Sequence, residues 1–538
     1  MTTRHMNYDL VIYNAEIVDG TGSPAYAGDV AIRDGRIEKI GELGPHSAKH
    51  EINAAGLALT PGFIDSHSHA DLTFPAGSAE NEKLRMGVTT EVIGQCGYSP
   101  YPLSSRHALL RKKSMAGFLP GVAFSWDWST LAEYRAMVEK RGMTHHAVPL
   151  VGHGSVRQAV MGDSQTKPSP AELDKMRGLV DEAMKDGAYG LSTGLIYAPG
   201  CFSETDEIIA LARVASDNHG LYVTHVRGET ASLIDAAMDE ALAVSRATGA
   251  PLQISHLKVI GLKPENQGRI NAVIQKLEAA KAQGMDIGFD CYPYTQGSTV
   301  LSSLLPRWAH AEGVSGLLDL LRSSEQRRKI RDSIEADDHG GEDWLLACGF
   351  DAVKVGSVSE SSAQGYVGRN LREISDDTGK NPYDALFDIL VEDNAGTVMV
   401  FSMLRPEDRN TVITHPLTMI GTDAIPCPPG QGRPHPRGYG AFPKILGGLV
   451  RELGLMSFEE AVRKMTQMSA RRYGLEDRGT IAEGMWADMV VLDRTAIIDR
   501  ATYENPRQRP EGLHYVFVEG QLALEHGELR TTNAGRFI

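Results

Sequence analysis

The feature that most constrains the fold of this chain is the alternation, across its middle, of short apolar segments with amphipathic segments of helical length. Such alternation is typical of βα units in a parallel sheet, as in the helical stretches at 170–187 and 229–249. Eight units of this kind predict a (β/α)8 TIM barrel of the α/β class. The predicted strands are Leu57–Asp65, Thr89–Ile93, Ala147–Val151, Ala188–Ser192, Leu221–Thr224, Leu252–Ser255, Asp286–Asp290 and Thr418–Thr422.

Both ends of the chain are rich in β-forming residues. Turn signals at Asp19-Gly20 and Asp34-Gly35 break the first part, and strand-like runs return at Met489–Leu492 and Tyr515–Val518. We therefore predict that residues 1–56 and 479–538 form one small β-sandwich domain, with the barrel at 57–478 between them.

The chain between the seventh and eighth strands is much longer than one crossover requires. This length predicts a mostly helical insert at about 304–381. The segment PYDALFDILVEDN (382–394) should then resume the barrel helix, and VMVFSM (398–403) should add a strand near the site.

Composition excludes several classes of function. The net charge of −15 over 538 residues opposes binding to nucleic acid or anionic membranes, which demand a basic surface. No run of eighteen apolar residues exists, and MTTRHMNYDLVIYN lacks the apolar core of a secretory signal. We predict a cytoplasmic protein with a small-molecule substrate. Reduced thiols are expected at the five scattered cysteines, Cys96, Cys201, Cys291, Cys348 and Cys427.

Side chains that bind metals recur at the ends of the predicted strands. His67 and His69 directly follow the first strand, and residues two apart on an extended strand point to the same face. Neutral imidazole is a preferred ligand of zinc, and barrel enzymes carry their active sites at the carboxyl ends of the strands. The other side chains of this kind at strand ends are Cys96, His225, His256 and Asp423.

Each of these residues alone has a simpler structural explanation. A His-x-His pair can open a loop, a lone cysteine is often a small buried hydrophobe, and an aspartate after a strand can be a cap. Eighteen histidines would otherwise scatter over helices and loops. The coincidence of residue type and position therefore favours a metal centre.

Short motifs spread from residue 57 to residue 493 carry a family resemblance. They are PGFIDSHSHAD, GVTTEVIGQCGYS, GLSTGLIYAPG, YVTHVRGE, QISHLK, DCYPYTQGST, MIGTDA, HPRGYGAFP and IAEGMWADMVVLD. Together they resemble the amidohydrolase superfamily and, within it, the N-acyl-D-amino-acid deacylase (D-aminoacylase) family. Cys96 in GQCG narrows the resemblance to this branch, because many relatives use a carboxylated lysine or a glutamate there. The resemblance implies a barrel, a β-sandwich from both termini, and an insert beside the site.

The same resemblance implies a zinc centre. A thiolate and two imidazoles leave zinc one open position, as expected of a catalytic rather than a structural metal. Metal coordination would also keep Cys96 deprotonated, which makes it a ligand and not a nucleophile. The implied ligands are Cys96, His225 and His256 for one tight zinc, and His67, His69 and Asp423, sharing Cys96, for a possible second, weaker site.

The implied reaction is zinc-dependent hydrolysis of N-acyl-D-amino acids to a carboxylate and a free D-amino acid. Asp423 would act first as general base toward water and then as general acid toward the leaving nitrogen. A guanidinium suits an α-carboxylate because it binds both oxygens. The residues that match carboxylate-binding positions of the family are Lys258, Tyr292, Ser298 and Arg437, with Arg433 as an alternative to Arg437.

Two rival functions stay open at this point. One is hydrolysis of a cyclic amide, as in hydantoinases or dihydroorotases, against which Cys96 counts. The other is a non-catalytic barrel scaffold, against which the full set of ligands counts. The sequence leaves open the amino-acid side chain, the acyl group and the oligomeric state.

Overall fold

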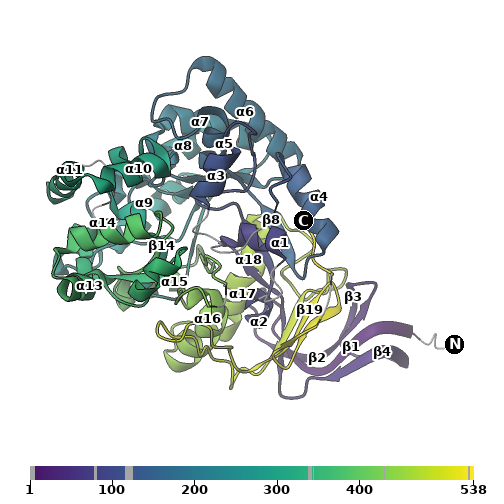
Figure 1. Ribbon diagram of the computed structural model, residues 1–538. Coiled ribbons are helices and arrows are strands. Elements are labelled where there is room, and N and C mark those ends of the chain that lie inside the picture. The colour runs from purple at the N-terminus through teal and green to yellow at the C-terminus, as the bar shows by residue number, and fades with distance from the viewer. Residues whose placement is uncertain are drawn as a thin grey trace.

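A barrel of parallel strands forms the middle of the molecule, with helices around it and the terminal β domain at the lower right of Figure 1. The computed structural model describes residues 6–77, 82–115, 125–336, 342, 344–428, 430–530 and 533–538. The barrel strands are β6 (Phe63–Asp65), β7 (Val88–Ile93), β8 (His146–Pro149), β9 (Val151–Gly152), β10 (Gly190–Gly194), β11 (Leu221–His225), β12 (Leu252–Ile254), β13 (Ile287–Cys291) and β17 (Thr418–Ile420).

The barrel closes on itself through backbone hydrogen bonds. All the barrel pairs are parallel, from β6 through β7 to β8 and from β9 through to β17. Only Leu150 separates β8 from β9, and its N–H donates to the carbonyl of Ile93 at 3.0 Å. The N–H of Ser66 donates to the carbonyl of Ile420 at 3.1 Å and joins β6 to β17. The predicted (β/α)8 barrel is therefore confirmed.

The outer helices begin and end where the sequence supplies caps. At the start of α6 (Pro170–Lys185), Ser169 and Glu172 form a reciprocal capping box. At the end of α8 (Ile234–Thr248), Gly249 adopts a left-handed φ of 75°, which costs glycine little. The other helices that cover the barrel include α4 (Leu131–Arg141), α5 (His153–Met161), α7 (Thr205–Asp217), α9 (Arg269–Ala282), α15 (Pro406–Thr414), α16 (Arg437–Lys444), α17 (Phe458–Met465) and α18 (Gln467–Arg472).

The first predicted strand is divided between two sheets. Its first half is β5 (Ala58–Pro61), which pairs antiparallel with β18 (Met489–Leu492) in the terminal sheet, and only its second half, β6, enters the barrel. Gly62 separates them, and a Cβ there would lie 2.2 Å from Thr89 Oγ1. The prediction of one strand at Leu57–Asp65 is therefore wrong. Both halves are buried and largely apolar, so the sequence pattern does not show where one strand ends and the next begins. The terminal sheet thus extends to Pro61 instead of ending at residue 56.

Both ends of the chain build one nine-stranded sheet, as predicted for a shared terminal domain. Leu10, Ile32, Met489 and Phe517 pack together in its core. The N–H of Ile37 donates to Met485 O at 2.8 Å, which brings one edge of the sheet against the segment that leads into β18. The remaining strands are β1 (Met6–Ile17), β2 (Tyr26–Arg33), β3 (Arg36–Ile40), β4 (His46–Asn53), β19 (Leu513–Val518), β20 (Gln521–Glu525) and β21 (Glu528–Leu529).

The insert between β13 and β17 is mostly helical at about 304–381, as predicted, and a small sheet lies beside its helices. It contains an antiparallel three-stranded sheet of β14 (Gln296–Val300), β16 (Val398–Ser402) and β15 (Val353–Ser357), so the extra strand at 398–402 is confirmed. Its helices are α10 (Gly313–Arg322), α11 (Ser324–Glu335), α12 (Trp344–Cys348), α13 (Leu371–Thr378) and α14 (Pro382–Glu392).

The helix α14 packs on α10 and α13 and so belongs to the insert. The prediction that PYDALFDILVEDN resumes the barrel helix is therefore wrong. The barrel position is taken by α15, which packs on α9 and β17. An amphipathic pattern shows that a helix buries one face, but it does not show which neighbour covers that face.

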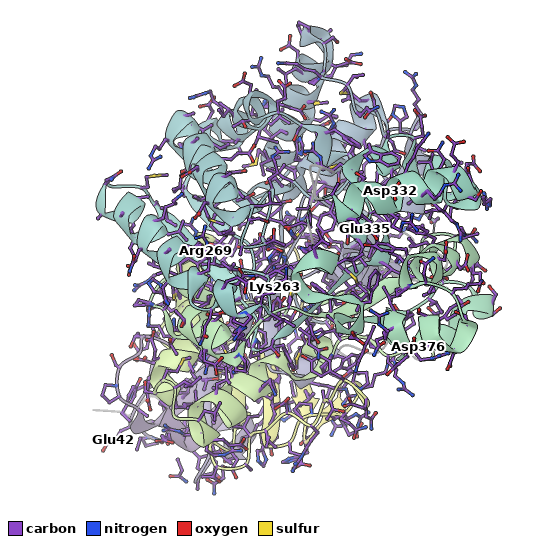
Figure 2. All side chains as sticks on the ribbon, turned by 90° about the vertical axis from the view of Figure 1, so that its left-hand side faces the viewer. Glu42, Lys263, Arg269, Asp332, Glu335 and Asp376 are labelled. Carbon is purple, nitrogen blue, oxygen red and sulfur yellow. The ribbon has the colours of Figure 1, made fainter. Side chains whose placement is uncertain are left out.

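Many charged side chains lie on the outside of the molecule. In Figure 2 the exposed side chains of Lys263, Arg269, Asp332, Glu335 and Asp376 lie on the outer parts of the barrel and insert. Among the described residues, no helix is both long and apolar enough to cross a membrane.

Candidate metal centre

Five barrel strands bring metal-binding side chains to one end of the barrel. His225 is the last residue of β11, and His67 and His256 stand two residues beyond the ends of β6 and β12. Cys96 and Asp423 stand three residues beyond β7 and β17. All five are buried, so the carboxyl ends of strands far apart in the sequence converge on one centre.

The distances between these side chains suit a bound ion. Cys96 Sγ lies 3.3 Å from His67 Nε2 and 3.4 Å from His256 Nε2. Zinc bonds of about 2.0–2.3 Å in a tetrahedron place neighbouring ligand atoms at about this separation. Three sets have their ligand atoms within 4.8 Å of one another: Cys96, His225 and His256; His67, His69 and Cys96; and His67, His256 and Asp423.

The backbone at three of these residues is strained. Cys96, His256 and Asp423 have φ angles of 53°, 35° and 51°, in the left-handed region that non-glycine residues rarely adopt. Such conformations cost of order 1–3 kcal/mol each and persist where the surrounding fold enforces them. At Cys96 the enforcing contact is close, since a Cβ on Gly194 would lie 2.0 Å from the Cys96 carbonyl oxygen.

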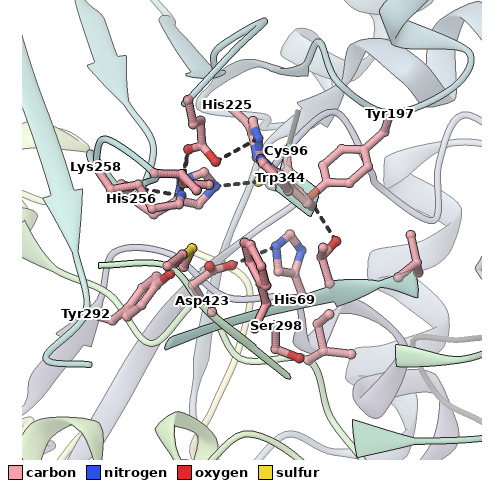
Figure 3. Close-up of a pocket in the computed structure, with 18 of the residues that line it drawn as sticks. His69, Cys96, Tyr197, His225, His256, Lys258, Tyr292, Ser298, Trp344 and Asp423 are labelled. Carbon is pink, nitrogen blue, oxygen red and sulfur yellow. Dashed lines mark hydrogen bonds and ion pairs between the residues drawn. The ribbon is translucent and has the colours of Figure 1, made fainter. Parts of the chain in front are cut away.

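The cluster opens into a pocket of about 570 Å³ (Figure 3). His69 lines this pocket, whereas His67 is fully buried and is not part of the lining. Two hydrogen-bond donors in its wall, the hydroxyl of Tyr292 and the indole N–H of Trp344, are buried and have no partner among the described residues. These donors are placed to bind polar atoms of a ligand.

Comparison with known proteins assigns the chain to a family. The model of the amidohydrolase family matches residues 50–523. D-aminoacylase of Alcaligenes xylosoxydans xylosoxydans is 32% identical over 99% of this chain and 97% of its own length. N-acyl-D-glutamate deacylase of the same organism is 34% identical over 95% of this chain and 93% of its own. The chain belongs to the amidohydrolase family.

A solved structure agrees with this assignment. The crystal structure of N-acyl-D-glutamate deacylase from Bordetella bronchiseptica, complexed with zinc and a phosphonate inhibitor, has a TM-score of 0.79 at 31% identity. The match covers 96% of each chain. The likeness thus includes the barrel, the terminal sheet and the insert of this amidohydrolase.

The protonation states of the cluster fit a metal. Burial lowers the pKa of His225 and of His256 well below the ordinary value, so both imidazoles are neutral. Neither ring nitrogen of His225 has a hydrogen-bond partner among the described residues, and its nearest carboxylate oxygen, on Glu229, lies 3.5 Å away. Burial raises the pKa of the Cys96 thiol, and a bound cation would reverse that effect. This donor set fits zinc.

Two buried carboxylates that the sequence analysis did not single out orient the ligands. Asp290 Oδ1 lies 3.1 Å from His67 Nδ1. The same oxygen accepts a hydrogen bond from the backbone N–H of His256 at 2.8 Å. Glu229 Oε1 lies 3.1 Å from His256 Nδ1, and Lys258 Nζ, which donates to Glu229, lies 2.7 Å from the same nitrogen. Carboxylates in this position fix the tautomer and angle of metal-binding histidines. Their position offered a signal, because Asp290 ends a predicted strand and Glu229 follows His225 by four residues.

The two predicted carboxylate-binding cations are both held by acidic groups. Lys258 lines the pocket, but its Nζ donates to Glu229 Oε1 at 2.6 Å. Arg437 is 1% exposed, and its Nη1 and Nη2 donate to Asp423 Oδ2 at 2.7 Å and to the Ser298 carbonyl at 2.9 Å. The alternative cation, Arg433, is exposed and is not part of the pocket lining. In the described state, Lys258 is therefore the cation that faces the pocket.

Proposed function

We propose that this amidohydrolase is a zinc-dependent deacylase that hydrolyses N-acyl-D-amino acids to a carboxylate and a free D-amino acid. The observation that carries the proposal is the cluster of Cys96, His225 and His256 at the barrel mouth, with Asp423 beside it. The full-length similarity to D-aminoacylase and to N-acyl-D-glutamate deacylase supports the substrate class. The cyclic-amide rival has weaker support, since these relatives act on linear amides.

We assign the tight zinc to Cys96, His225 and His256, because this set combines a thiolate with two neutral imidazoles. When bound, the zinc supplies a Lewis acid for the amide carbonyl and lowers the pKa of water. A second, weaker site would use His67, His69 and Asp423 and share Cys96.

Asp423 is the proposed proton carrier. Burial by itself would raise the pKa of its carboxyl, but the Arg437 guanidinium holds that pKa well below its ordinary value. Asp423 is therefore an anion ready to accept a proton. Its Oδ2 is held by Arg437, which leaves Oδ1, 3.2 Å from His69 Nε2, to take a proton from water and pass it to the leaving nitrogen.

The substrate carboxylate is assigned to the side of the pocket formed by Lys258, Tyr292 and Ser298. Burial raises the pKa of Tyr292 well above its ordinary value, so its hydroxyl keeps its proton and can donate. Arg437 lies behind this side, 4.7 Å from the Tyr292 ring centroid. The set thus offers a neutral donor and one cation to an anionic group.

Tyr292→Phe tests this assignment. The variant should lose about 10- to 100-fold in kcat/KM on N-acyl-D-amino acids, the value of one hydrogen bond to a charged group. Its thermal stability should not change, because the hydroxyl has no partner in the described structure. Substrates in which a primary amide replaces the carboxylate should be hydrolysed poorly by the parent enzyme. Their kcat/KM should be nearly the same for the parent and for Tyr292→Phe.

Arg437→Ala is the comparison variant. A loss confined to the acid substrates would assign to Arg437 the carboxylate recognition predicted from the sequence. An equal loss on acids and amides would assign it to holding Asp423, the role that its contacts support. An unaltered Tyr292→Phe enzyme would instead remove Tyr292 from carboxylate binding.

The pocket also favours a neutral amino-acid side chain. Its wall includes Trp344 and Phe401, stacked at 5.7 Å between ring centroids, together with Ile260 and Met403. Among the described lining residues Lys258 is the single cation, and Glu229 already binds it. A second substrate carboxylate would be buried without a partner, which costs several kcal/mol.

A panel of N-acetyl-D- and N-acetyl-L-amino acids, run with zinc content measured on the same sample, tests the proposed function. N-acetyl-D-leucine, -methionine and -phenylalanine should be hydrolysed at least ~10-fold faster, in kcat/KM, than N-acetyl-D-glutamate. Hydantoin and dihydroorotate serve as controls and should not react. Hydrolysis of these cyclic amides without turnover of the linear D-substrates would favour the rival function, and preference for glutamate would contradict the side-chain assignment. A cytoplasmic location stays a prediction from the sequence.

A further inference from the structure

A second cavity adjoins the pocket of the metal centre. It holds about 1110 Å³ of empty space, including its opening to solvent. The two cavities share Tyr98, Tyr197 and Val300 in their linings, so no more than one layer of side chains separates them. We call the second cavity the outer chamber.

The outer chamber lies on the side of the metal centre away from the assigned carboxylate position. In Figure 3, Tyr292 and Lys258 lie on one side of the ligands and Tyr197 on the opposite side. The Tyr197 ring centroid is 5.1 Å from that of His225 and 5.5 Å from that of Tyr98. With the substrate carboxylate at Tyr292 and the amide at the metal ligands, the acyl group points toward Tyr197 and the outer chamber.

The lining of the outer chamber suits an uncharged chain. Its inner part is apolar, with Ile196 and Val300 next to the two tyrosines, and Leu110 and Leu317 continue this surface. Burial lowers the pKa of His310 to about 4, so this lining residue is neutral near pH 7.

Of the three charged lining residues, Glu312 and Lys113 are exposed, and Lys113 and Asp163 have partners of their own. Asp163 Oδ1 accepts from Gln158 Nε2 at 2.7 Å, and Lys113 Nζ donates to Ser315 Oγ at 3.3 Å. An alkyl chain that follows the apolar side of the chamber therefore leaves these contacts in place.

We propose that the outer chamber binds the acyl group and that the enzyme prefers unbranched aliphatic acyl groups longer than acetyl. This inference rests on the proposed function, because the direction of the acyl group depends on where the carboxylate and amide lie. An acetyl group ends at the metal centre and cannot reach past Tyr197, whereas a longer chain gains burial with each methylene.

The test is a chain-length series on the zinc-loaded enzyme with N-acetyl-, N-butanoyl-, N-hexanoyl- and N-octanoyl-D-leucine. For the parent enzyme kcat/KM should rise about threefold for each methylene buried in the chamber, and hexanoyl should exceed acetyl by at least ~10-fold. Ala198→Phe places a ring in the chamber lining and should bring this ratio close to 1. The matched control, Ala282→Phe at the exposed end of α9, should keep the parent ratio.

The outcomes separate the two proposals. A flat or falling series in a parent enzyme that cleaves N-acetyl-D-leucine overturns the acyl assignment and leaves the deacylase function standing. No cleavage of any member overturns the deacylase function itself. An unchanged ratio in a folded Ala198→Phe enzyme also overturns the acyl assignment. If that variant does not fold, Ser302→Phe places a ring in the chamber from another part of its lining and is read in the same way.

Discussion

The Cys96→Ala enzyme is expected to lose its tight zinc and, with it, at least ~10³-fold in turnover. Cys96 supplies the thiolate in the assigned ligand set, and its ligand atom lies within 4.8 Å of those of His225 and His256. A catalytic metal contributes several kcal/mol to the transition state, and each 1.36 kcal/mol is tenfold in rate. Metal analysis after dialysis and a hydrolysis assay on the same sample check both expectations.

Cys291→Ala is the matched control for this variant. Cys291 is also a buried cysteine on a barrel strand, but it is outside the lining of the metal pocket. The control should keep its zinc and its activity, so that any loss in Cys96→Ala is not a general effect of removing a buried thiol. A fully zinc-loaded and fully active Cys96→Ala enzyme would end the assignment of Cys96 as a ligand.

The Asp423→Asn enzyme should keep the tight zinc and lose ~10² to 10⁴ in kcat. Asparagine has nearly the shape of aspartate but cannot carry a proton between water and the leaving nitrogen, and general acid-base catalysis is worth about this factor. The ligand set of the tight site, Cys96, His225 and His256, does not include Asp423. Zinc content and single-turnover rates on one preparation separate the two roles.

The fold of the Asp423→Asn enzyme needs its own control, since Asp423 also pairs with the buried Arg437. Removing one partner of a buried ion pair costs about 3–5 kcal/mol, although the amide oxygen of asparagine can still accept from the guanidinium. Thermal unfolding should therefore show a modest drop in Tm, while Asp174→Asn, at an exposed aspartate, should show none. Near-normal activity, or loss of the tight zinc, would show that the proposed role of Asp423 is wrong.

Much of the fold could be predicted because its signals are local. A buried parallel strand is rich in β-branched and apolar residues, as at β7 and β11, and a helix carries caps such as Ser169 and Glu172. The division of 57–65 was not predictable in this way. Ala58 and Phe63 are equally buried, one in the terminal sheet and the other in the barrel, so the apolar pattern continues across Gly62.

The packing of the insert helices could not be predicted from local sequence either. The apolar residues of α14, such as Leu386 and Leu390, are needed for any buried helix face. Whether that face meets the barrel or α10 and α13 depends on the path of the chain through β14, β15 and β16. No local pattern encodes that path.

By itself, the sequence determined that strands end in metal-binding residues, because the carboxyl ends of parallel strands meet at one face of a barrel wherever each strand lies in the chain. Only the tertiary structure decided which charges are free to meet a ligand. Lys258 and Arg437 are cations in the sequence, yet Glu229 and Asp423 hold them, across 29 and 14 residues of chain. The energy of such a pair depends on the distance and burial of both groups, and these are set only when the whole chain has folded.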